Sequence, residues 1–393
     1  MANEEIMLTD SFPVGKLGVI PLESCKELGG KVNSYLVQWR HEREANHLDS
    51  ISLAAYRSDS YIVKTSVPRF GSGEAKGTVL QSVRGLDVYI IVDVTNYSMT
   101  YKMAGQINHM SPDDHYSDLK RIIAAIEGKA KRITVIMPFL YESRQHKRSS
   151  RESLDCAIAL QELVKMGVDN IITFDAHDPR VQNAIPLHGF ETVQPAYQFI
   201  KNILKNVKDL KIDNDHLMII SPDEGGTSRA VYMAGVLGVD MGMFYKRRDY
   251  SKIVDGRNPI VAHEFLGSSV EGKDVIIVDD MISSGESMID VAKELKKRKA
   301  NRIFAVSTFG LFTNGMESFD KAVEEGILYK VVTTNLVYQT PELLSKDYYI
   351  SCDMSKYIAY IIDTLNHDAS ISGLLDPYDR IQKIVTKYKN GEY

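Results

Sequence analysis

Residues 274–287 read Asp-Val-Ile-Ile-Val-Asp-Asp-Met-Ile-Ser-Ser-Gly-Glu-Ser, and this stretch decides the expected fold. Its apolar run, residues 275–278, has the character of a strand buried on both faces. Two acids, Asp279 and Asp280, follow it, and then comes a short loop of hydroxyl residues with one glycine. Apolar residues beyond the loop recur at the spacing of one helical stripe: Met288, Val291, Ala292 and Leu295.

A strand, acids, a small loop and a helix start can form a site for a sugar phosphate. Backbone N–H groups and the dipole at a helix N-terminus attract a phosphate, while carboxylates at the strand end can accept sugar hydroxyls or bind a metal. An ordinary strand-to-helix turn explains the same residues, with a capping box from Ser283 to Glu286. The stretch alone does not separate these interpretations.

The composition is that of a globular protein. Hydrophobic residues make up 44% and charged residues 25% of the 393 positions, and the net charge of −5 gives no reason to expect nucleic-acid binding. No apolar run is long enough for a membrane span, and the first ten residues do not resemble a signal peptide. Cys25, Cys156 and Cys352 lack metal-ligand spacing and are typical of buried thiols. We therefore expect a cytoplasmic protein.

Apolar runs alternate with helical stripes along most of the chain, which is typical of parallel sheets flanked by helices. The clearest helix start is at Ser111, where an N-cap hydroxyl is followed by Pro112 and two acids. A charged stretch at 41–47 lacks the spacing of a zinc-binding helix and is expected to be a solvated helix face or loop. Expected strands are residues 17–20, 88–94, 132–137, 170–174, 217–221, 240–245, 275–278, 302–308 and 329–334.

Chemistry-bearing residues follow four of these strands, whose carboxyl ends should meet at one sheet edge. Acids with a basic cluster suit a magnesium-dependent reaction on a polyphosphate, because carboxylates hold the metal and cations neutralise charge on the transferred group. Taken singly, each has an ordinary explanation as a structural histidine, a turn or a solvated loop. The residues are His177 with Asp175 and Asp178, Asp223, Asp279 with Asp280, and Lys246 with Arg247 and Arg248.

Two common nucleotide-binding motifs are not supported. The glycines at 71, 73 and 77 miss the dinucleotide fingerprint by one residue and open no periodic helix, and the chain has no Gly-x4-Gly-Lys-Ser/Thr run.

From about residue 70 to about residue 375 the chain resembles the ribose-phosphate pyrophosphokinase (phosphoribosyl pyrophosphate synthetase) family. Residues 275–282 resemble the signature that this family shares with phosphoribosyltransferases. Further segments favour the synthetase: 70–74 resembles its adenine-site loop, 143–145 its second ATP segment, 174–177 and 221–226 its metal-binding segments, and 245–248 its flexible catalytic loop.

The resemblance implies transfer of the β,γ-diphosphoryl group of ATP to the C1 hydroxyl of ribose 5-phosphate, giving phosphoribosyl pyrophosphate and AMP. The implied catalytic residues are Lys246 and Arg248, and Mg²⁺ is the implied cofactor, near His177 and Asp223. ATP-binding residues would be Phe70, Ser72, Gly73, Glu74, Arg144 and Gln145. Ribose 5-phosphate would be bound by Asp223, Asp279, Asp280, Ser283, Ser284, Gly285, Glu286 and Ser287.

The implied fold is α/β, with two similar phosphoribosyltransferase-like domains, each a mostly parallel sheet flanked by helices. We expect an N-terminal, ATP-side domain at 1–187 completed by a C-terminal segment, a ribose 5-phosphate domain at 188–365, and a tail at 366–393. In the family a neighbouring subunit partly holds ATP, which implies a homo-oligomer, a dimer or a hexamer. Neither a nucleic acid nor a membrane is an expected partner.

The phosphate loop departs from the usual Asp-Thr-Gly-Gly-Thr of the family. Glu286 places a carboxylate beside the phosphate unless a capping box turns it away, and Ser72 stands where an acid or amide is common. Two alternatives stay open, a non-catalytic regulatory synthetase-like subunit and a phosphoribosyltransferase. Against the first argues the retention of four residues, Lys246, Arg248, His177 and Asp223. Against the second argue the ATP-like segments.

Overall fold

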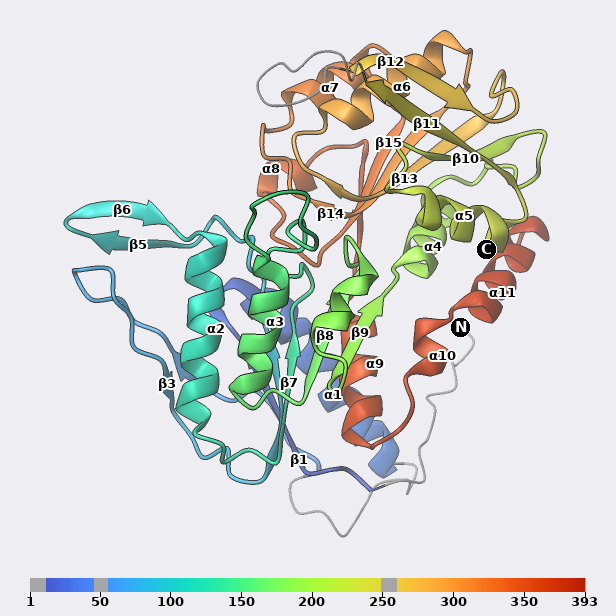
Figure 1. Cartoon of the computed structure of the whole chain (residues 1–393). Coiled ribbons are helices and arrows are strands. Elements are labelled where there is room, and N and C mark those ends of the chain that lie inside the picture. The colour runs from blue at the N-terminus through green and yellow to red at the C-terminus, as the bar shows by residue number, and fades with distance from the viewer. Residues whose placement is uncertain (1–11, 46–55, 249–259, 393) are drawn as a thin grey trace. The chain divides into compact units, whose positions relative to one another are not determined.

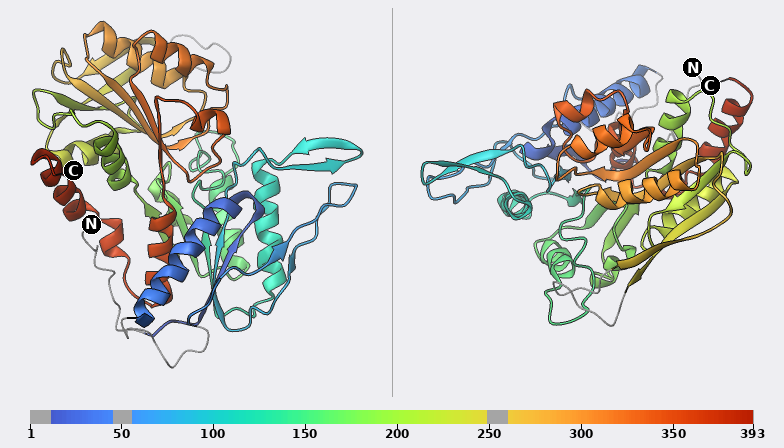
Figure 2. Two further views of the ribbon diagram at one scale, coloured as in Figure 1. Left: turned by 180° about the vertical axis from the view of Figure 1, so that it is seen from behind. Right: turned by 90° about the horizontal axis from the view of Figure 1, so that it is seen from above.

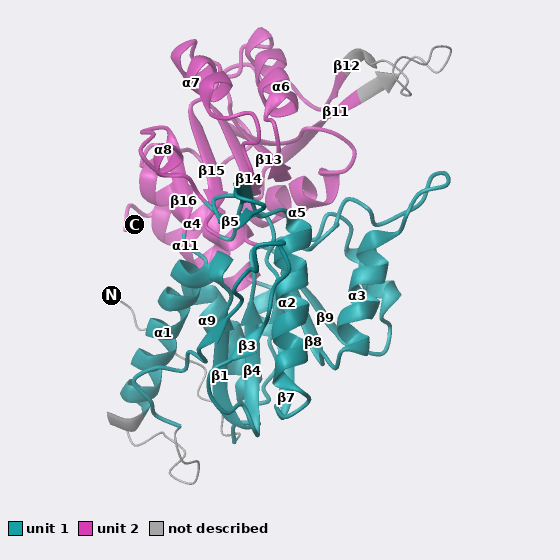
Figure 3. Cartoon of the chain, turned by 90° about the vertical axis from the view of Figure 1, so that its left-hand side faces the viewer, with its two compact units in different colours: residues 1–194, 336–338, 353–376 teal, residues 195–335, 339–352, 377–393 magenta. Residues whose placement is uncertain are grey.

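The computed structural model describes residues 12–45, 56–248 and 260–392. The chain divides into two compact units (Figure 3). Unit 1 comprises residues 1–194, 336–338 and 353–376, and unit 2 comprises 195–335, 339–352 and 377–393. In this division residues 353–376 join unit 1 and residues 377–393 join unit 2. We expected a C-terminal segment to complete the first domain, a second domain at 188–365 and a tail at 366–393. None of the helices in the described part of the chain is long and apolar enough to cross a lipid bilayer.

Unit 1 is built on a five-stranded sheet in which all pairs are parallel. The strand order is β1 (Lys16–Pro21), β4 (Leu86–Ile91), β7 (Arg132–Ile136), β8 (Asn170–Phe174) and β9 (Gly189–Val193). Helices α1 (Lys26–Ala45) and α9 (Ser355–Asn366) pack together on one face, and the other face carries α2 (Pro112–Ile126) and α3 (Asp155–Lys165) (Figure 1). The short helices are η1 (Glu23–Cys25), η2 (Pro179–Ala184) and α10 (Ser372–Leu375).

Two small antiparallel pairs complete unit 1. Strands β2 (Thr65–Ser66) and β3 (Thr78–Val79) flank the loop that contains residues 70–74. Strands β5 (Thr100–Met103) and β6 (Gln106–His109) form a hairpin that stands out from its unit beside that loop (Figures 1 and 2).

Unit 2 contains a seven-stranded sheet that is parallel except for β12 at one edge. The order is β12 (Ile260–Leu266), β11 (Asp240–Arg248), β10 (Leu217–Ser221), β13 (Asp274–Ile282), β14 (Ile303–Gly310), β15 (Lys330–Thr334) and β16 (Tyr349–Cys352). One face packs on α4 (Ala196–Asn206), α5 (Thr227–Leu237) and α11 (Tyr378–Lys389). The other packs on α6 (Glu286–Lys297), α7 (Glu317–Glu324) and α8 (Pro341–Leu344).

The α/β class and the buried character of the central strand are confirmed. In β13, Ile276 and Val278 belong to one core, whereas Val275 and Ile277 belong to the other, as the period of two along a strand requires. The strands expected at 170–174 and 217–221 occur with those bounds. The helix expected after Ser111 begins there, and the charged stretch forms the end of α1, with residues 46–47 outside the described residues. All three cysteines are buried.

Strands β11 and β13 run on through charged residues that we expected to follow them. Strand β13 continues through both acids to Ile282, because β14 keeps pairing with it as far as Gly310. Strand β11 includes Lys246 to Arg248, which we expected to follow the strand, because β12 pairs with it there in the antiparallel sense. In both cases the strand continues as long as a neighbouring strand pairs with it. No local sequence pattern reveals this pairing.

Part of the expected tail belongs to a core of unit 2. In α11, Ile381 and Val385 are buried in unit 2. The Tyr388 hydroxyl donates to the Val207 carbonyl at 2.7 Å and accepts from the Leu210 N–H at 2.9 Å. Residues 377–389 therefore act as a helical layer of unit 2.

A buried charged network joins α9 to the rest of unit 1. Arg40 is fully buried and donates to Asn366 Oδ1 at 2.6 Å, while Asn366 Nδ2 donates to Asp87 of β4 at 2.8 Å. Arg43 donates to both carboxylate oxygens of Asp363. Burial alone would raise the pKa of Asp363, but the hydrogen bonds and charge of Arg43, with the charge of Arg40, hold it below its ordinary value.

Replacing this carboxylate is expected to destabilise unit 1. Asp363→Ala leaves two buried guanidinium groups without their acid and should lower the free energy of unfolding by about 3–5 kcal/mol. Urea denaturation followed by tryptophan fluorescence measures this, because Trp39 of α1, the only tryptophan, stacks on Tyr360 of α9 with ring centroids 4.4 Å apart.

The lowered pKa of Asp363 also sets the direction of a pH effect. The stabilisation is present above the ordinary aspartate pKa of 3.8 and is lost as pH falls through the lower folded value. The native protein should therefore lose stability more steeply than Asp363→Asn in that range. Glu27→Ala, at an exposed pair on α1, is the control and should change little; an equal effect of the two alanine variants would contradict the network's role.

Candidate active site

Strands β10 and β13 bring three carboxylates together in unit 2. The two strands pair in parallel as far as Ile220 and Ile277, so the loop after β10 carries Asp223 to the place where β13 presents Asp279 and Asp280. Burial and the nearby carboxylates of Asp280 and Asp223 raise the pKa of Asp279 well above its ordinary value. Acids that repel one another favour a ligand that brings positive charge or donates hydrogen bonds.

Backbone groups hold Asp223 in place. Its Oδ1 accepts from the N–H groups of Gly225 at 2.9 Å and Gly226 at 3.3 Å. A Cβ on Gly226 would lie 2.9 Å from Ser221 Oγ and 3.3 Å from the Val278 carbonyl. Glycine there lets helix α5 begin close against β13, which keeps Asp223 beside the other two acids.

Arg229 is a site residue that we did not identify from the sequence. It lies on α5, and its side chain is only 10% exposed. A guanidinium nitrogen lies 3.9 Å from Asp280 Oδ2, and another donates to the Gly225 carbonyl at 3.4 Å. The one signal in the sequence was a cation three residues after the Gly-Gly pair, a position that the structure places on the first turn of α5. This ion pair offsets part of the negative charge of the acids.

The loop from Ser283 to Ser287 ends in a glycine-dependent helix start. Gly285 has φ of +86° and is the N-cap of α6, and a Cβ there would lie 2.3 Å from the Phe319 ring. The alternative of a capping box from Ser283 to Glu286 does not occur, because no side chain caps the helix and the Glu286 N–H donates to the Ser284 hydroxyl at 3.4 Å. The first intrahelical bond comes from Ile289, so the N–H groups of the first turn are oriented toward the loop, as an anion would require.

In unit 1, His177 lies in the segment after β8, at the carboxyl edge of the sheet. It is exposed, and its ring centroid lies 5.3 Å from that of His146. His146 Nε2 is 3.5 Å from Asp178 Oδ2, and Arg180 pairs with the same carboxylate. The hydrogen bond from Arg180 lowers the pKa of Asp178, and burial lowers the pKa of His146. His146 was not identified from the sequence, where it is one of several polar residues in a basic loop.

The predicted ATP segments occupy two loops of unit 1. Residues 70–74, which we call the nucleotide loop, form a tight turn in which the Phe70 N–H donates to the Glu74 carbonyl at 2.7 Å. The Ser72 hydroxyl donates to the Glu74 carboxylate at 2.8 Å, and the Phe70 side chain is 55% exposed. Arg144, which is exposed, and Gln145 follow β7, and Gln145 Oε1 is buried without a hydrogen-bond partner.

Lys246 and Arg248 are placed by the backbone of β11. Met243 of this strand lies opposite Ser221 at the end of β10, so Lys246 and Arg248 extend beyond that end. The backbone of both residues therefore lies past the same end of β10 from which the loop with Asp223 begins.

The predicted metal ligands belong to different units, His177 to unit 1 and Asp223 to unit 2. Mg²⁺ prefers oxygen ligands, of which the carboxylate of Asp223 is one, whereas imidazole is a less suitable ligand. Within the residues that the structure describes, no three His, Cys, Asp or Glu side chains are arranged so that they could together hold a metal ion.

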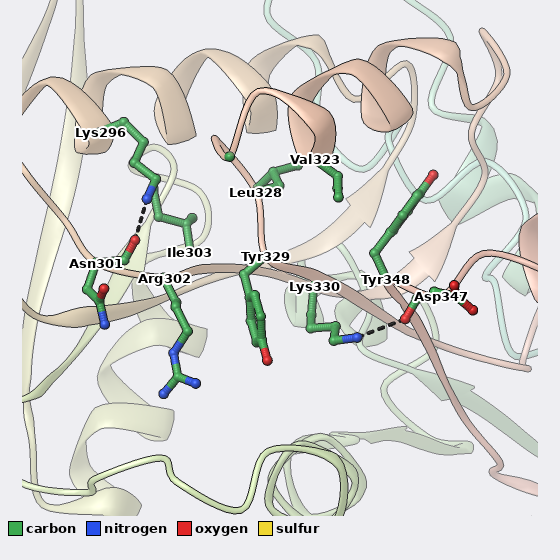
Figure 4. Close-up of a pocket in the computed structure, with 11 residues that line it drawn as sticks. Lys296, Asn301, Arg302, Ile303, Val323, Leu328, Tyr329, Lys330, Asp347 and Tyr348 are labelled. Atoms are coloured by element: carbon green, nitrogen blue, oxygen red, sulfur yellow. Dashed lines mark hydrogen bonds between the residues drawn. The ribbon is translucent and has the colours of Figure 1, made fainter.

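A pocket of about 400 Å³ lies elsewhere in unit 2 (Figure 4). Its lining includes Arg302, Tyr329 and Lys330 at the beginnings of β14 and β15. Lys330 donates to the Asp347 carbonyl at 2.8 Å, and Arg302 pairs with Asp209 and Asp274. Because it opens at the amino ends of the strands, this pocket is separate from the acids at their carboxyl ends.

Comparison with known proteins agrees with this arrangement of two units. Residues 17–167 match the N-terminal domain of ribose phosphate pyrophosphokinase, and residues 190–322 match the phosphoribosyl transferase domain. The ribose-phosphate pyrophosphokinase of Shewanella oneidensis is 30% identical over 316 residues, which cover 78% of this chain and 89% of that protein. That of Vibrio cholerae is 29% identical, with 79% and 90% covered.

A solved structure shows the same fold. Phosphoribosylpyrophosphate synthetase from Mycobacterium smegmatis matches with a TM-score of 0.69 and 20% identity, over 90% of this chain and 100% of that one. The two domain matches and the extent of the similarity to curated relatives together show that this chain belongs to the ribose-phosphate pyrophosphokinase family.

Proposed function

We propose that this protein transfers the β,γ-diphosphoryl group of ATP to the C1 hydroxyl of ribose 5-phosphate, giving phosphoribosyl pyrophosphate and AMP. The observation that carries the proposal is the cluster of Asp223, Asp279 and Asp280 beside the glycine-dependent start of α6. It occurs in a chain whose similarity covers about nine-tenths of proteins named for this activity.

Ribose 5-phosphate fits unit 2. The 5-phosphate would accept hydrogen bonds from the first-turn N–H groups of α6 and from the hydroxyls of Ser283, Ser284 and Ser287. The ribose hydroxyls would donate to Asp279 and Asp280, which replaces repulsion between carboxylates with hydrogen bonds. Arg229 would hold Asp280 in place through their ion pair.

ATP binding falls to unit 1. The exposed ring of Phe70 offers a face on which adenine can stack, and the backbone of Gly73 and the polar groups of Ser72 and Glu74 can pair with its edge. Arg144 would bind a phosphate, and the buried Gln145 Oε1 lacks a donor, which a ligand N–H or O–H could supply. A neighbouring subunit could complete this site in a homo-oligomer, a dimer or a hexamer, as the family resemblance implies.

Cationic side chains and Mg²⁺ would both act on the transferred diphosphoryl group. Lys246 and Arg248, beyond the end of β10, would neutralise the charge that develops on it. Asp223 of unit 2 would hold Mg²⁺, with His177 of unit 1 as the other metal residue that the family resemblance implies. When bound, the ion would supply charge neutralisation at the phosphate oxygens. We expect the reaction to take place in the cytoplasm.

The deciding assay is AMP formation from ATP in the presence of Mg²⁺, with and without ribose 5-phosphate. The protein should form AMP and phosphoribosyl pyrophosphate only when the sugar is present. Lys246→Ala should lower kcat about 100-fold or more, because one preorganised charge-stabilising group is lost, with little change in thermal stability. Lys293→Ala, at an exposed lysine of α6, is the matched control.

Three results would contradict the proposed reaction itself. ADP in place of AMP would mean transfer of a single phosphoryl group. ATP binding without ribose-dependent AMP would favour a regulatory synthetase-like subunit. Formation of a nucleoside monophosphate from phosphoribosyl pyrophosphate and a free base would favour a phosphoribosyltransferase. Near-normal turnover of Lys246→Ala would remove that residue from its role.

Glu286 provides a test of the phosphate subsite. Its exposed carboxylate stands at the first position of α6, where it competes with an anion for the positive end of the helix. Glu286→Gln should lower the KM for ribose 5-phosphate about two- to fivefold at low salt, with a smaller effect at high salt because the charge is screened. Steady-state kinetics at two ionic strengths measure this.

The matched control is Asp290→Asn, one turn along the same helix and exposed. It should leave the KM nearly unchanged. If Glu286→Gln has no effect at low salt, the phosphate does not bind at this helix start.

A further inference from the structure

The β5–β6 hairpin makes three separate contacts with the nucleotide loop and its flank. The Ala104 N–H, at the tip of the hairpin, donates to the Gly71 carbonyl at 2.9 Å. The Met103 thioether packs on Gly73 so closely that a Cβ there would lie 2.7 Å from its sulfur. The Tyr101 ring lies under the Arg69 guanidinium, 5.1 Å from ring centroid to Cζ. The hairpin therefore touches the loop with both its backbone and its side chains.

The opposite side of the loop is tied to helix α2. Arg69, whose side chain is 9% exposed, binds Asp118 of α2 through two hydrogen bonds of 2.6 and 3.0 Å. Just past the loop, a Cβ on Gly77 would lie 2.8 Å from the backbone of Arg121. The Arg69 guanidinium thus lies between an acid of α2 and an aromatic ring of the hairpin.

The contacts come from one face of the hairpin. Tyr101 and Met103 are two residues apart on β5 and point to the same side, whereas Lys102 and its cross-strand partner Ile107 point to the other. Ile107 is 67% exposed. The hairpin thus offers a pair of residues that touch the loop region and, on its opposite face, a pair that points the other way.

We propose that the β5–β6 hairpin positions the nucleotide loop for ATP, with Tyr101 and Met103 as positioning residues that do not touch the nucleotide. This inference rests on the proposed function, since it assigns residues 70–74 to ATP. The loop has only short local hydrogen bonds of its own, and Phe70 is exposed at its start. Contacts on both sides restrict the loop before ATP binds, so the loop loses less conformational entropy when it binds ATP. This raises the affinity for ATP without new contacts to the nucleotide.

The test compares the two faces of the hairpin in the full-length protein. Tyr101→Leu and Met103→Ala, singly and together, should each raise the KM for ATP about fivefold, with little change in kcat or in the KM for ribose 5-phosphate. The control variants Lys102→Ala and Ile107→Ala should leave all three unchanged. Thermal melts establish that every variant is folded.

Hydrogen–deuterium exchange gives a readout that does not depend on activity. In the double variant the amides of Phe70 and Gly73, which bond within the loop, and of Lys76, which bonds to Pro68 across its base, should exchange about fivefold faster. Those of α2 should not change. The proposal is overturned if the double variant leaves exchange unchanged, if it changes exchange without changing the KM for ATP, or if the control pair has the same effects.

Failure of the proposed function gives a different result. A native protein that forms no ribose-dependent AMP contradicts the assigned reaction. Faster exchange in the Tyr101 and Met103 variants, together with weaker binding of ATP by calorimetry, would still support the positioning role, and unchanged ATP affinity would overturn it.

Discussion

The arrangement of unit 2 depends on the pairing of β13 with a parallel neighbour on each side. Its backbone groups form hydrogen bonds with β10 and β14, and its side chains alternate between the cores on the two faces of the sheet. A shift of one residue would exchange the two faces, so the pairing register of β13 is fixed. Because β14 pairs with β13 up to Gly310, both acids are held on an extended strand. The rigid strand keeps Asp279 and Asp280 close to Asp223 despite their mutual repulsion, which would separate carboxylates on a mobile loop.

Close approaches at glycines complete the same site. Gly226 lets α5 begin against β13, and Gly285 adopts a left-handed conformation beneath the Phe319 ring, where a side chain has no room. Helix α5 in turn supplies Arg229, whose buried charge faces Asp280. A substrate with hydroxyls at one end and a phosphate at the other matches this sequence of acids, loop and helix start.

The C-terminal part of the chain contributes to both units. Residues 353–376 complete unit 1, where Asp363 and Asn366 bind buried arginines of α1, and residues 377–393 add a helix to the core of unit 2. An isolated N-terminal fragment would leave Arg40 and Arg43 without these partners, at a large cost in free energy. The chain therefore crosses between the units several times, so neither unit is one continuous segment.

The sequence by itself determined the α/β class, the central buried strand and the identity of the acids, because apolar periodicity and the residues that follow each strand are local properties. It also carried the family resemblance, which the comparisons bear out. Only the tertiary structure decided that β11 and β13 run on through the charged residues, since the partner strands that extend them lie far away in the sequence. The same holds for Gly285 as N-cap in place of a capping box, for Arg229 beside Asp280, and for the hairpin against the nucleotide loop. These features depend on contacts between segments whose proximity no local pattern encodes.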